Sequence, residues 1–264
     1  MRVLISFFKI ALKDKTEFSQ DLVFDFLNYI TYILITAFMW TGVISTFGNI
    51  GGWTSFNFIM LTCFAGLYRS FNNFFSGTWQ MKNNIIDGTL DKYLCRPVNV
   101  YFSVLGENFE PISLIEGIIT ITVTLVISCF TLKPTGISFL FNIIPSIIVF
   151  GCGTVCIMCI KSIVSLLTVW LGDISIFQNI LFFEDLQFDR YPTFFLSKGF
   201  NIFFNWIVPL GLIATYPAYV LTFNLERSEL LSILLRTVGI TLLWIVLLHV
   251  IYKKAIKHYE SFGG

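Results

Sequence analysis

The sequence predicts an all-α protein that crosses a membrane several times. Hydrophobic residues make up 56% of the 264 residues, and charged residues make up only 12%. A soluble domain of this length carries roughly 25% charged residues, and a single core could not bury this much apolar surface. The 17 basic and 16 acidic side chains nearly balance, so the net charge gives no reason to expect a nucleic-acid partner.

Apolar stretches of about 20 residues, the length needed to cross the hydrocarbon of a bilayer, predict six membrane spans. Segment 1–21 precedes them and is expected to lie on the inner membrane surface. Residues 2–17 are too short and too charged to span, and their polar side chains follow one helical stripe. All elements belong to a single transmembrane domain over residues 1–264. The expected spans are residues 22–46, 54–75, 110–131, 137–160, 163–183 and 230–252.

Basic residues decide how these spans are oriented, because short loops rich in Lys and Arg stay in the cytoplasm. They gather in the amino-terminal segment, in residues 76–100 and in the carboxyl-terminal tail, and Lys161 falls between the fourth and fifth spans. Six spans place all of these regions in the cytoplasm, whereas seven do not. Both termini are therefore expected on the cytoplasmic side, with residues 76–100 as a cytosolic loop.

A further apolar stretch, residues 200–222, is interrupted by Pro209, Gly211 and Pro217. Counting it as a seventh span would place the two termini on opposite sides of the membrane, against the distribution of basic residues. We therefore expect residues 184–229 to form an extracellular, re-entrant segment whose irregular backbone is shielded by neighbouring helices.

A short polar segment, residues 87–97, lies between the second and third spans and carries charges of both signs. Its apolar positions recur at helical spacing, and a polar residue before them can cap a helix. Pro97 disfavours helical backbone at Arg96, so a helix of about two turns is expected. Such a helix between spans typically docks a cytosolic partner. The apolar positions are Leu90, Tyr93 and Leu94, and the expected cap is Asp87 or Thr89.

Motifs for catalysis and for metal binding are absent from the sequence. It contains no phosphate-binding loop of the form GxxxxGK followed by Ser or Thr, no paired-histidine zinc motif and no nucleophile elbow. Cys152, Cys156 and Cys159 share one helical face, but no His, Asp or Glu accompanies them, so packing is favoured over a metal site. We expect no catalytic, cofactor-binding or metal-binding residue in this chain, and any ATP hydrolysis has to occur in a separate subunit.

Three ordered motifs point to a known family. From Gly88 to Pro97 the chain reads G-T-L-D-K-Y-L-C-R-P, which matches the pattern G-x-L-D-x-x-L-x-R-P at every fixed position. Over nearly its whole length the chain resembles the type-2 permeases of ATP-binding-cassette (ABC) transporters, in the bacterial subfamily that carries this pattern. The other two motifs are Arg190-Tyr191-Pro192, followed by Pro209 and Tyr216-Pro217-Ala218, and the tail Tyr259-Glu260-Ser261-Phe262-Gly263-Gly264.

The resemblance implies a permease half of six helices in a bacterial plasma membrane. It implies pairing with a second permease, identical or paralogous, and with two ATP-binding subunits that hold ATP and Mg²⁺. Residues 1–21 would be the connecting helix and residues 192–222 the re-entrant pair, with Arg190, Tyr191, Pro192, Pro209, Tyr216 and Pro217 as its marker residues. The coupling helix that docks on the ATPase would comprise Asp87, Gly88, Thr89, Leu90, Asp91, Lys92, Tyr93, Leu94, Arg96 and Pro97. Within it Leu90, Tyr93 and Leu94 would supply the buried contact, and Asp91, Lys92 and Arg96 would set the register.

The resemblance also implies export, with a substrate path lined by helices that face the second permease. In the first span, aromatic and small polar side chains suit a hydrophobic or amphipathic cargo, although packing or lipid contact explains such a stripe equally. Asp173, placed inside the fifth span, either lines a polar pathway or pairs with a neighbouring helix. The residues of the first span are Phe24, Asn28, Thr31, Tyr32, Ile35, Phe38 and Met39.

Two other functions remain open from the residues alone. An ion-coupled secondary transporter needs a buried carboxylate network and usually an inverted repeat, and the sequence shows only isolated Asp173 and no repeat. A membrane-embedded lipid-modifying enzyme needs clustered His, Asp or Glu side chains near one interface, and the chain has two histidines. An adjacent gene for an ABC ATPase would favour the permease over both.

Overall fold

The computed structural model describes residues 19–95, 97, 99–131, 137–175 and 191–260. Across these residues the chain is helical and contains no β-strand, which confirms the predicted all-α class. The surface helix expected over residues 1–21 lies, up to residue 18, outside the described residues. Arg96 and Arg190 also lie outside the described residues.

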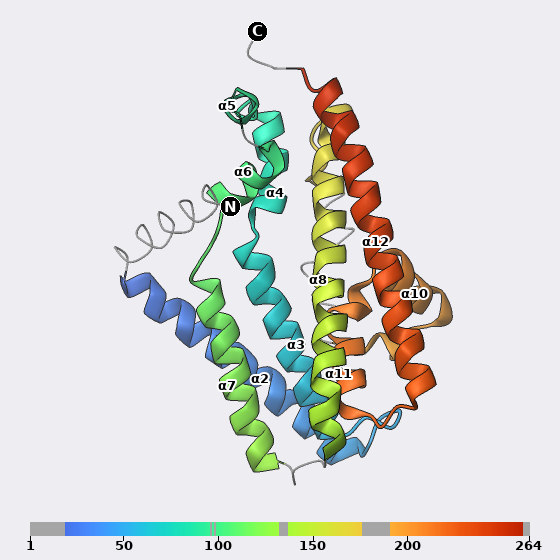
Figure 1. The fold of residues 1–264 in the computed structure, drawn as a ribbon. Helices are drawn as coiled ribbons and strands as arrows, with labels where there is room; N and C mark the ends of the chain where they lie inside the picture. The colour runs from blue at the N-terminus through green and yellow to red at the C-terminus, as the bar shows by residue number, and fades with distance from the viewer. Residues whose placement is uncertain (1–18, 96, 98, 132–136, 176–190, 261–264) are drawn as a thin grey trace.

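Three described helices are long and apolar enough to cross a membrane, and they lie within α2 (Ser19–Phe47), α8 (Ile137–Leu171) and α12 (Arg227–His258). Two shorter helices, α3 (Ser55–Phe74) and α7 (Ser113–Thr131), pack beside them (Figure 1). The chain is therefore a membrane-embedded protein. The remaining helices are α4 (Gly77–Ile86), α5 (Asp91–Leu94), α6 (Val100–Glu107), η3 (Thr193–Phe195), α10 (Lys198–Ile202), η4 (Phe203–Ile207), η5 (Leu210–Leu212) and α11 (Thr215–Thr222).

The expected fourth and fifth spans, residues 137–160 and 163–183, are wrong as separate helices. A single helix, α8, runs through Lys161 without a break. The Lys161 side chain is 4% exposed, and its Nζ donates to the Asn72 Oδ1 at 2.8 Å. Because this cation is hydrogen-bonded inside the protein, it does not require a cytosolic turn. The helix ends instead before Gly172, whose φ of 72° is the left-handed conformation typical of a helix end.

The helices define two ends of the molecule (Figure 1). At one, which we call the basic end, α5 and the carboxyl end of α12 lie near each other. The other, the far end, contains the turn from Gly48 to Trp53 and the start of α12. Helices α4 and α5 and the carboxyl end of α12 bring several basic residues to this end, namely Lys82, Lys92, Lys253, Lys254 and Lys257.

Residues 191–222 fold back toward the far end, and we call them the fold-back segment. At its start the Tyr191 ring lies edge-on to Trp40, with ring centroids 6.0 Å apart. Its middle reaches α8, where a Cβ on Gly153 would lie 2.4 Å from the Leu212 carbonyl oxygen, so only glycine permits this approach. At its end Asn57 Nδ2 donates to Thr222 Oγ1 at 2.8 Å.

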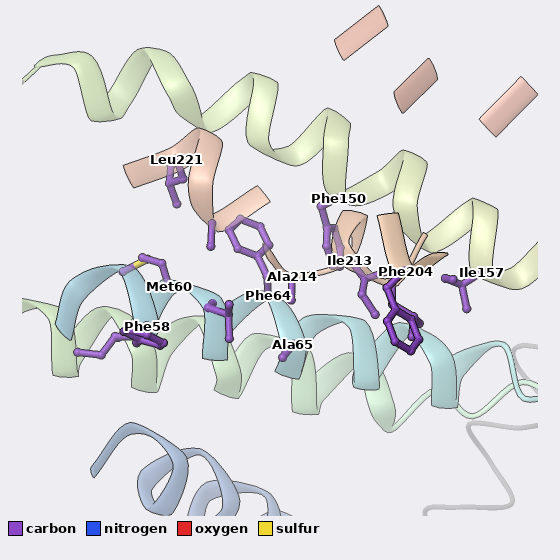
Figure 2. Close-up of a cluster of buried hydrophobic side chains, with 14 of the residues drawn as sticks. Phe58, Met60, Phe64, Ala65, Phe150, Ile157, Phe204, Ile213, Ala214 and Leu221 are labelled. Carbon is purple, nitrogen blue, oxygen red and sulfur yellow. The ribbon is translucent and has the colours of Figure 1, made fainter. Parts of the chain in front are cut away.

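The largest buried apolar cluster lies where the fold-back segment packs between α3 and α8 (Figure 2). Figure 2 shows Phe64 of α3, Phe150 of α8 and Ala214 of the fold-back segment pointing toward one another. The Phe64 and Phe150 ring centroids are 5.6 Å apart. Val208, Pro209 and Leu210 are buried, so the irregular backbone at this bend packs against other parts of the chain, whereas the nearby Trp206 and Ile207 are exposed.

Candidate functional site: the cap at the basic end

Helices α4, α5 and α6, residues 77–107, form a compact unit at the basic end that we call the cap (Figure 1). Helix α4 ends at Ile86, Asp87 is its C-cap residue, and Gly88 follows with a φ of 67°. The Leu90 amide then donates to the Asn84 carbonyl at 3.0 Å, which closes the turn with backbone atoms. Gly88 is needed here because its backbone lies in the left-handed region.

Helix α5 is shorter than the two turns expected, and neither predicted cap residue begins it. It contains the single turn Asp91–Leu94, and its preceding residue, Leu90, makes no side-chain capping bond. Asp87 is instead the C-cap residue of α4, and Thr89 Oγ1 donates to Asn84 Oδ1 at 3.1 Å. Thr89 Oγ1 is thus bonded within the turn after α4, and the residue before α5 is Leu90, so neither predicted residue occupies the cap position of α5.

Two of the three apolar residues expected to contact a partner are buried within this chain. Leu90 and Tyr93 are each 1% exposed, whereas Leu94 is 39% exposed. The prediction that all three form the docking contact is therefore wrong for Leu90 and Tyr93, because their side chains turn inward onto the cap and the ends of two long helices. Their buried neighbours are Met81, Ile85, Val100, Val104, Leu166 and Ala255.

The outer surface of α5 carries polar side chains beside the exposed Leu94. Lys92 Nζ lies 2.7 Å from Glu107 Oε1 of α6, and 4.7 Å from the centroid of the Tyr93 ring. The hydrogen bond to Glu107 raises the pKa of Lys92, although both side chains are partly exposed. Burial, followed by the nearby Asp91 carboxylate, raises the pKa of the Tyr259 hydroxyl to about 12. Asp87, Thr89, Cys95 and Pro97 are exposed around this surface.

The cap is attached to α8 and α12. Ser165 Oγ of α8 donates to the Thr78 carbonyl of α4 at 2.9 Å, and the Tyr101 hydroxyl of α6 lies 2.9 Å from the Ser162 Oγ. Ala255 of α12 is fully buried among the cap residues. The cap is therefore in direct contact with two long helices.

Asp173 is not inside a span, contrary to expectation. It follows the end of α8 at the basic end, and its side chain is 64% exposed. Its Oδ1 accepts a hydrogen bond from the Ser175 amide at 3.0 Å and lies 3.8 Å from Lys82 Nζ of α4. The hydrogen bonds from Ser175 lower the pKa of this carboxyl group. The error has one cause: α8 continues to Leu171, which moves Asp173 out to the turn.

Most of the α2 residues that were expected to line a substrate path point away from the rest of the chain. Tyr29, Ile33, Ala37 and Trp40 are buried on the opposite stripe of the helix. Tyr32 is half-buried, with the Arg69 guanidinium carbon 5.0 Å from its ring centroid. The other predicted residues are exposed, namely Phe24, Asn28, Thr31, Ile35, Phe38 and Met39.

In the fold-back segment, a buried polar network was missed from the sequence. The Thr193 amide donates to Thr215 Oγ1 at 3.2 Å, and Thr193 Oγ1 donates to Asn205 Oδ1 at 2.9 Å. Asn205 Nδ2 in turn donates to Asn201 Oδ1 at 2.9 Å. The sequence carried a signal for this network, because its residues are among the few polar ones in a largely apolar run that prolines interrupt. A Cβ on Gly211 would lie 2.0 Å from Asn205 Oδ1, so this position requires glycine.

The marker residues of this segment have distinct places. Pro192 and Pro209 are buried at its bends, next to η3 and η5 respectively. Tyr216 is half-buried, and Pro217 lies in the first turn of α11. The Pro217 carbonyl accepts a hydrogen bond from Ser146 Oγ of α8 at 2.8 Å, which ties the returning helix to α8.

The fold and the cap define a helical membrane protein that presents a short, internally packed helix at its basic end. A family model described as "ABC-2 family transporter protein" matches residues 30–263. The chain belongs to this family of ABC transporter permeases, as the motifs predicted, although the match does not test the motifs themselves. No curated protein matches the sequence.

Proposed function

We propose that this chain is the permease subunit of an ABC exporter of hydrophobic or amphipathic cargo, powered by two separate ATP-binding subunits. The packing of the cap carries this proposal. Leu90 and Tyr93 anchor α5 to α8 and α12, while Lys92, Leu94 and Cys95 remain exposed at the basic end. Such a surface can receive a partner and pass its movement to membrane helices.

The basic end would face the cytoplasm of a bacterial cell, because Lys82, Lys92 and the basic tail gather there. Helix α8 ends at the basic end, and Tyr191 lies beside Trp40 toward the far end. Both termini are proposed to be cytoplasmic, as the distribution of basic residues favours.

The outward stripe of α2 would face a second permease, identical or paralogous, across the substrate path. Asn28 and Thr31 add hydrogen-bonding groups to the aromatic and aliphatic side chains of this stripe, which suits a cargo with both polar and apolar parts. The ion-coupled alternative loses support, since Asp173, its one candidate carboxylate, is exposed at a helix end.

Cys95 offers a direct test, because it is exposed immediately after α5, whereas Cys156 and Cys159 are buried. Membranes of the natural host are opened, labelled with a photoactivatable maleimide and irradiated, and the proteins joined to the chain are identified by mass spectrometry. We expect a chain carrying a phosphate-binding loop. Cys95→Ser serves as the control and should remove the adduct. Efficient labelling of Cys95 without any ATP-binding chain among the adducts would refute the proposed docking.

A further inference from the structure

The long helices form two groups that are bonded internally. The first, which we call the α3 group, contains α2, α3 and α7. The Tyr29 hydroxyl of α2 donates to the Gly66 carbonyl of α3 at 2.6 Å, and Thr120 Oγ1 of α7 donates to the Tyr29 oxygen at 3.0 Å. Ser70 Oγ of α3 also donates to the Ser113 carbonyl at the start of α7.

The second, the α8 group, contains the cap, α8 and α12. The hydrogen bonds of Ser165 and Ser162 attach the cap to α8, and the buried Ala255 attaches it to α12. Further along, Thr241 Oγ1 of α12 donates to the Cys152 carbonyl of α8 at 3.4 Å. The cap therefore belongs with α8 and α12, although its chain continues directly from α3.

Two connections join the groups at the basic end, and they lie side by side. One is Phe75–Ser76, between α3 and α4, and the other is 108–112, between α6 and α7. Ser76 Oγ donates to the Asn108 carbonyl at 2.6 Å, and the Phe74 and Phe109 rings stack with centroids 4.9 Å apart. Because both connections are non-helical and paired, they can serve as one hinge between the groups.

At the far end the groups are held together by the fold-back segment. Asn57 of α3 bonds to Thr222, and Ser146 of α8 bonds to the Pro217 carbonyl. Separation of the groups is therefore resisted at the far end. Movement is expected at the basic end, where the hinge lies.

Lys161 joins the two groups next to this hinge. Its Nζ donates to Asn72 Oδ1 at 2.8 Å, two residues before the end of α3, and lies 5.0 Å from the ring centroid of Trp79 in α4. With 4% exposure, the ammonium group is costly to bury, so its contacts strongly favour the arrangement that satisfies them. One buried cation thus contacts the helices on both sides of the Phe75–Ser76 break.

We propose that Lys161 is a positioning residue that latches the α3 group to the α8 group. When the latch opens, the cap, α8 and α12 move together against α2, α3 and α7 about the paired connections. The basic end then opens while the far end stays tied. Only the use of this movement in transport rests on the proposed function, because the latch itself follows from the packing.

Hydrogen exchange followed by mass spectrometry, on the chain in lipid nanodiscs, tests the latch without an ATPase. The hinge has amides to follow: Thr78 N donates to the Phe75 carbonyl at 3.1 Å, and Glu110 N donates to the Phe74 carbonyl at 3.4 Å. Lys161→Met keeps the length of the side chain and removes its charge. We expect exchange in peptides covering 75–80 and 108–112 to accelerate on the order of tenfold, because local opening becomes easier.

Asn72→Asp should change hydrogen exchange at the hinge in the opposite direction, an effect that a merely structural role of Lys161 does not predict. A carboxylate opposite Lys161 strengthens the hydrogen bond, so hinge exchange should slow several-fold. Lys82→Met is the matched control. Its Nζ donates to Ser175 Oγ at 2.6 Å and lies near Asp173, both just after α8, so this bond stays within the α8 group and the hinge should exchange as in the unaltered chain.

Two outcomes would overturn the inference. The first is hinge exchange that stays within twofold of the unaltered chain in both Lys161→Met and Asn72→Asp. The second is acceleration in Lys161→Met that is equal at the hinge and at the Tyr29–Thr120 contact, because that result shows general destabilisation. Neither depends on crosslinking at Cys95, so the latch and the proposed function can fail separately.

Discussion

Leu90 and Leu94 allow the internal and external roles of α5 to be separated with one type of substitution. They lie four positions apart, and they are 1% and 39% exposed respectively. Leu90→Ala leaves a cavity among Met81, Ile85 and the other buried cap residues, with an expected loss of about 2–5 kcal/mol. Leu94→Ala removes partly solvated atoms and should cost less than about 1 kcal/mol.

The assay combines stability with docking. For a chain of this size, about 2–5 kcal/mol corresponds to a fall of roughly 4–20 °C in the midpoint of thermal unfolding. Unfolding in detergent is followed by the loss of the monodisperse peak in size-exclusion chromatography. Leu90→Ala should show this fall, while Leu94→Ala should keep its midpoint within about 4 °C. Photocrosslinking from Cys95 to an ATP-binding chain should then drop several-fold in Leu94→Ala.

The result that would refute this reasoning is an equal loss of thermal stability in the two variants, because the packing assigns only Leu90 to the interior of the cap. A Leu94→Ala chain of normal stability and unchanged crosslinking yield would remove Leu94 from the docking surface. A combined Tyr93 and Leu94 substitution tests neither role alone, since Tyr93 is buried and Leu94 is exposed.

Two further predictions follow from single contacts. Gly211→Ala should destabilise the chain by about 2–4 kcal/mol, because the new Cβ would lie 2.0 Å from Asn205 Oδ1 and disrupt a buried network. Gly239→Ala is the control: a Cβ there would meet no atom within 4 Å, so this variant should be neutral or stabilising in the same thermal assay. Glu107→Gln should cost at most about 1 kcal/mol at pH 7, since the Lys92 pair is partly exposed and screened. The folded-state pKa of Lys92 is raised, so this contribution is complete below its unfolded pKa of about 10.4 and is lost as pH rises through the folded pKa. The check is to measure the thermal midpoints of the unaltered chain and of Glu107→Gln from pH 7 to 11. A difference between the two midpoints that changes between pH 7 and 9 would contradict the assignment of this contribution to the Lys92–Glu107 pair.

The turn and short helix around Gly88 could be predicted from the sequence because they depend on local interactions. A left-handed glycine after α4 and a proline after α5 act on their own backbone and immediate neighbours, so their effect appears in the order of residues. Helical spacing likewise placed Leu90, Tyr93 and Leu94 on a short helix. Spacing could not tell which of them face inward, because their covering residues include Leu166 and Ala255, far along the chain.

The incorrect prediction of a cytosolic turn at Lys161 also arose from a contact with a residue distant in the sequence. A rule based on charge assigns a lysine in an apolar run to a cytosolic turn, since an unpaired ammonium group is costly in hydrocarbon. The rule fails here because Asn72 lies within hydrogen-bonding distance after folding, although it is 89 residues earlier in the chain. The position of Asp173 was wrong in consequence, because it depended on where α8 ends.

By itself, the sequence determined the all-α class, the membrane location and the family, because hydropathy, composition and local motifs are properties of consecutive residues. It also determined that the apolar run over residues 200–222 is interrupted, and the structure places the interruptions at Val208–Pro209 and at Ile213–Ala214. The tertiary structure alone decided which face of α5 is interior, where α8 ends and how Lys161 joins two groups of helices. Each of these depends on which distant side chains supply hydrogen bonds or apolar cover, and that is settled only when the helices pack.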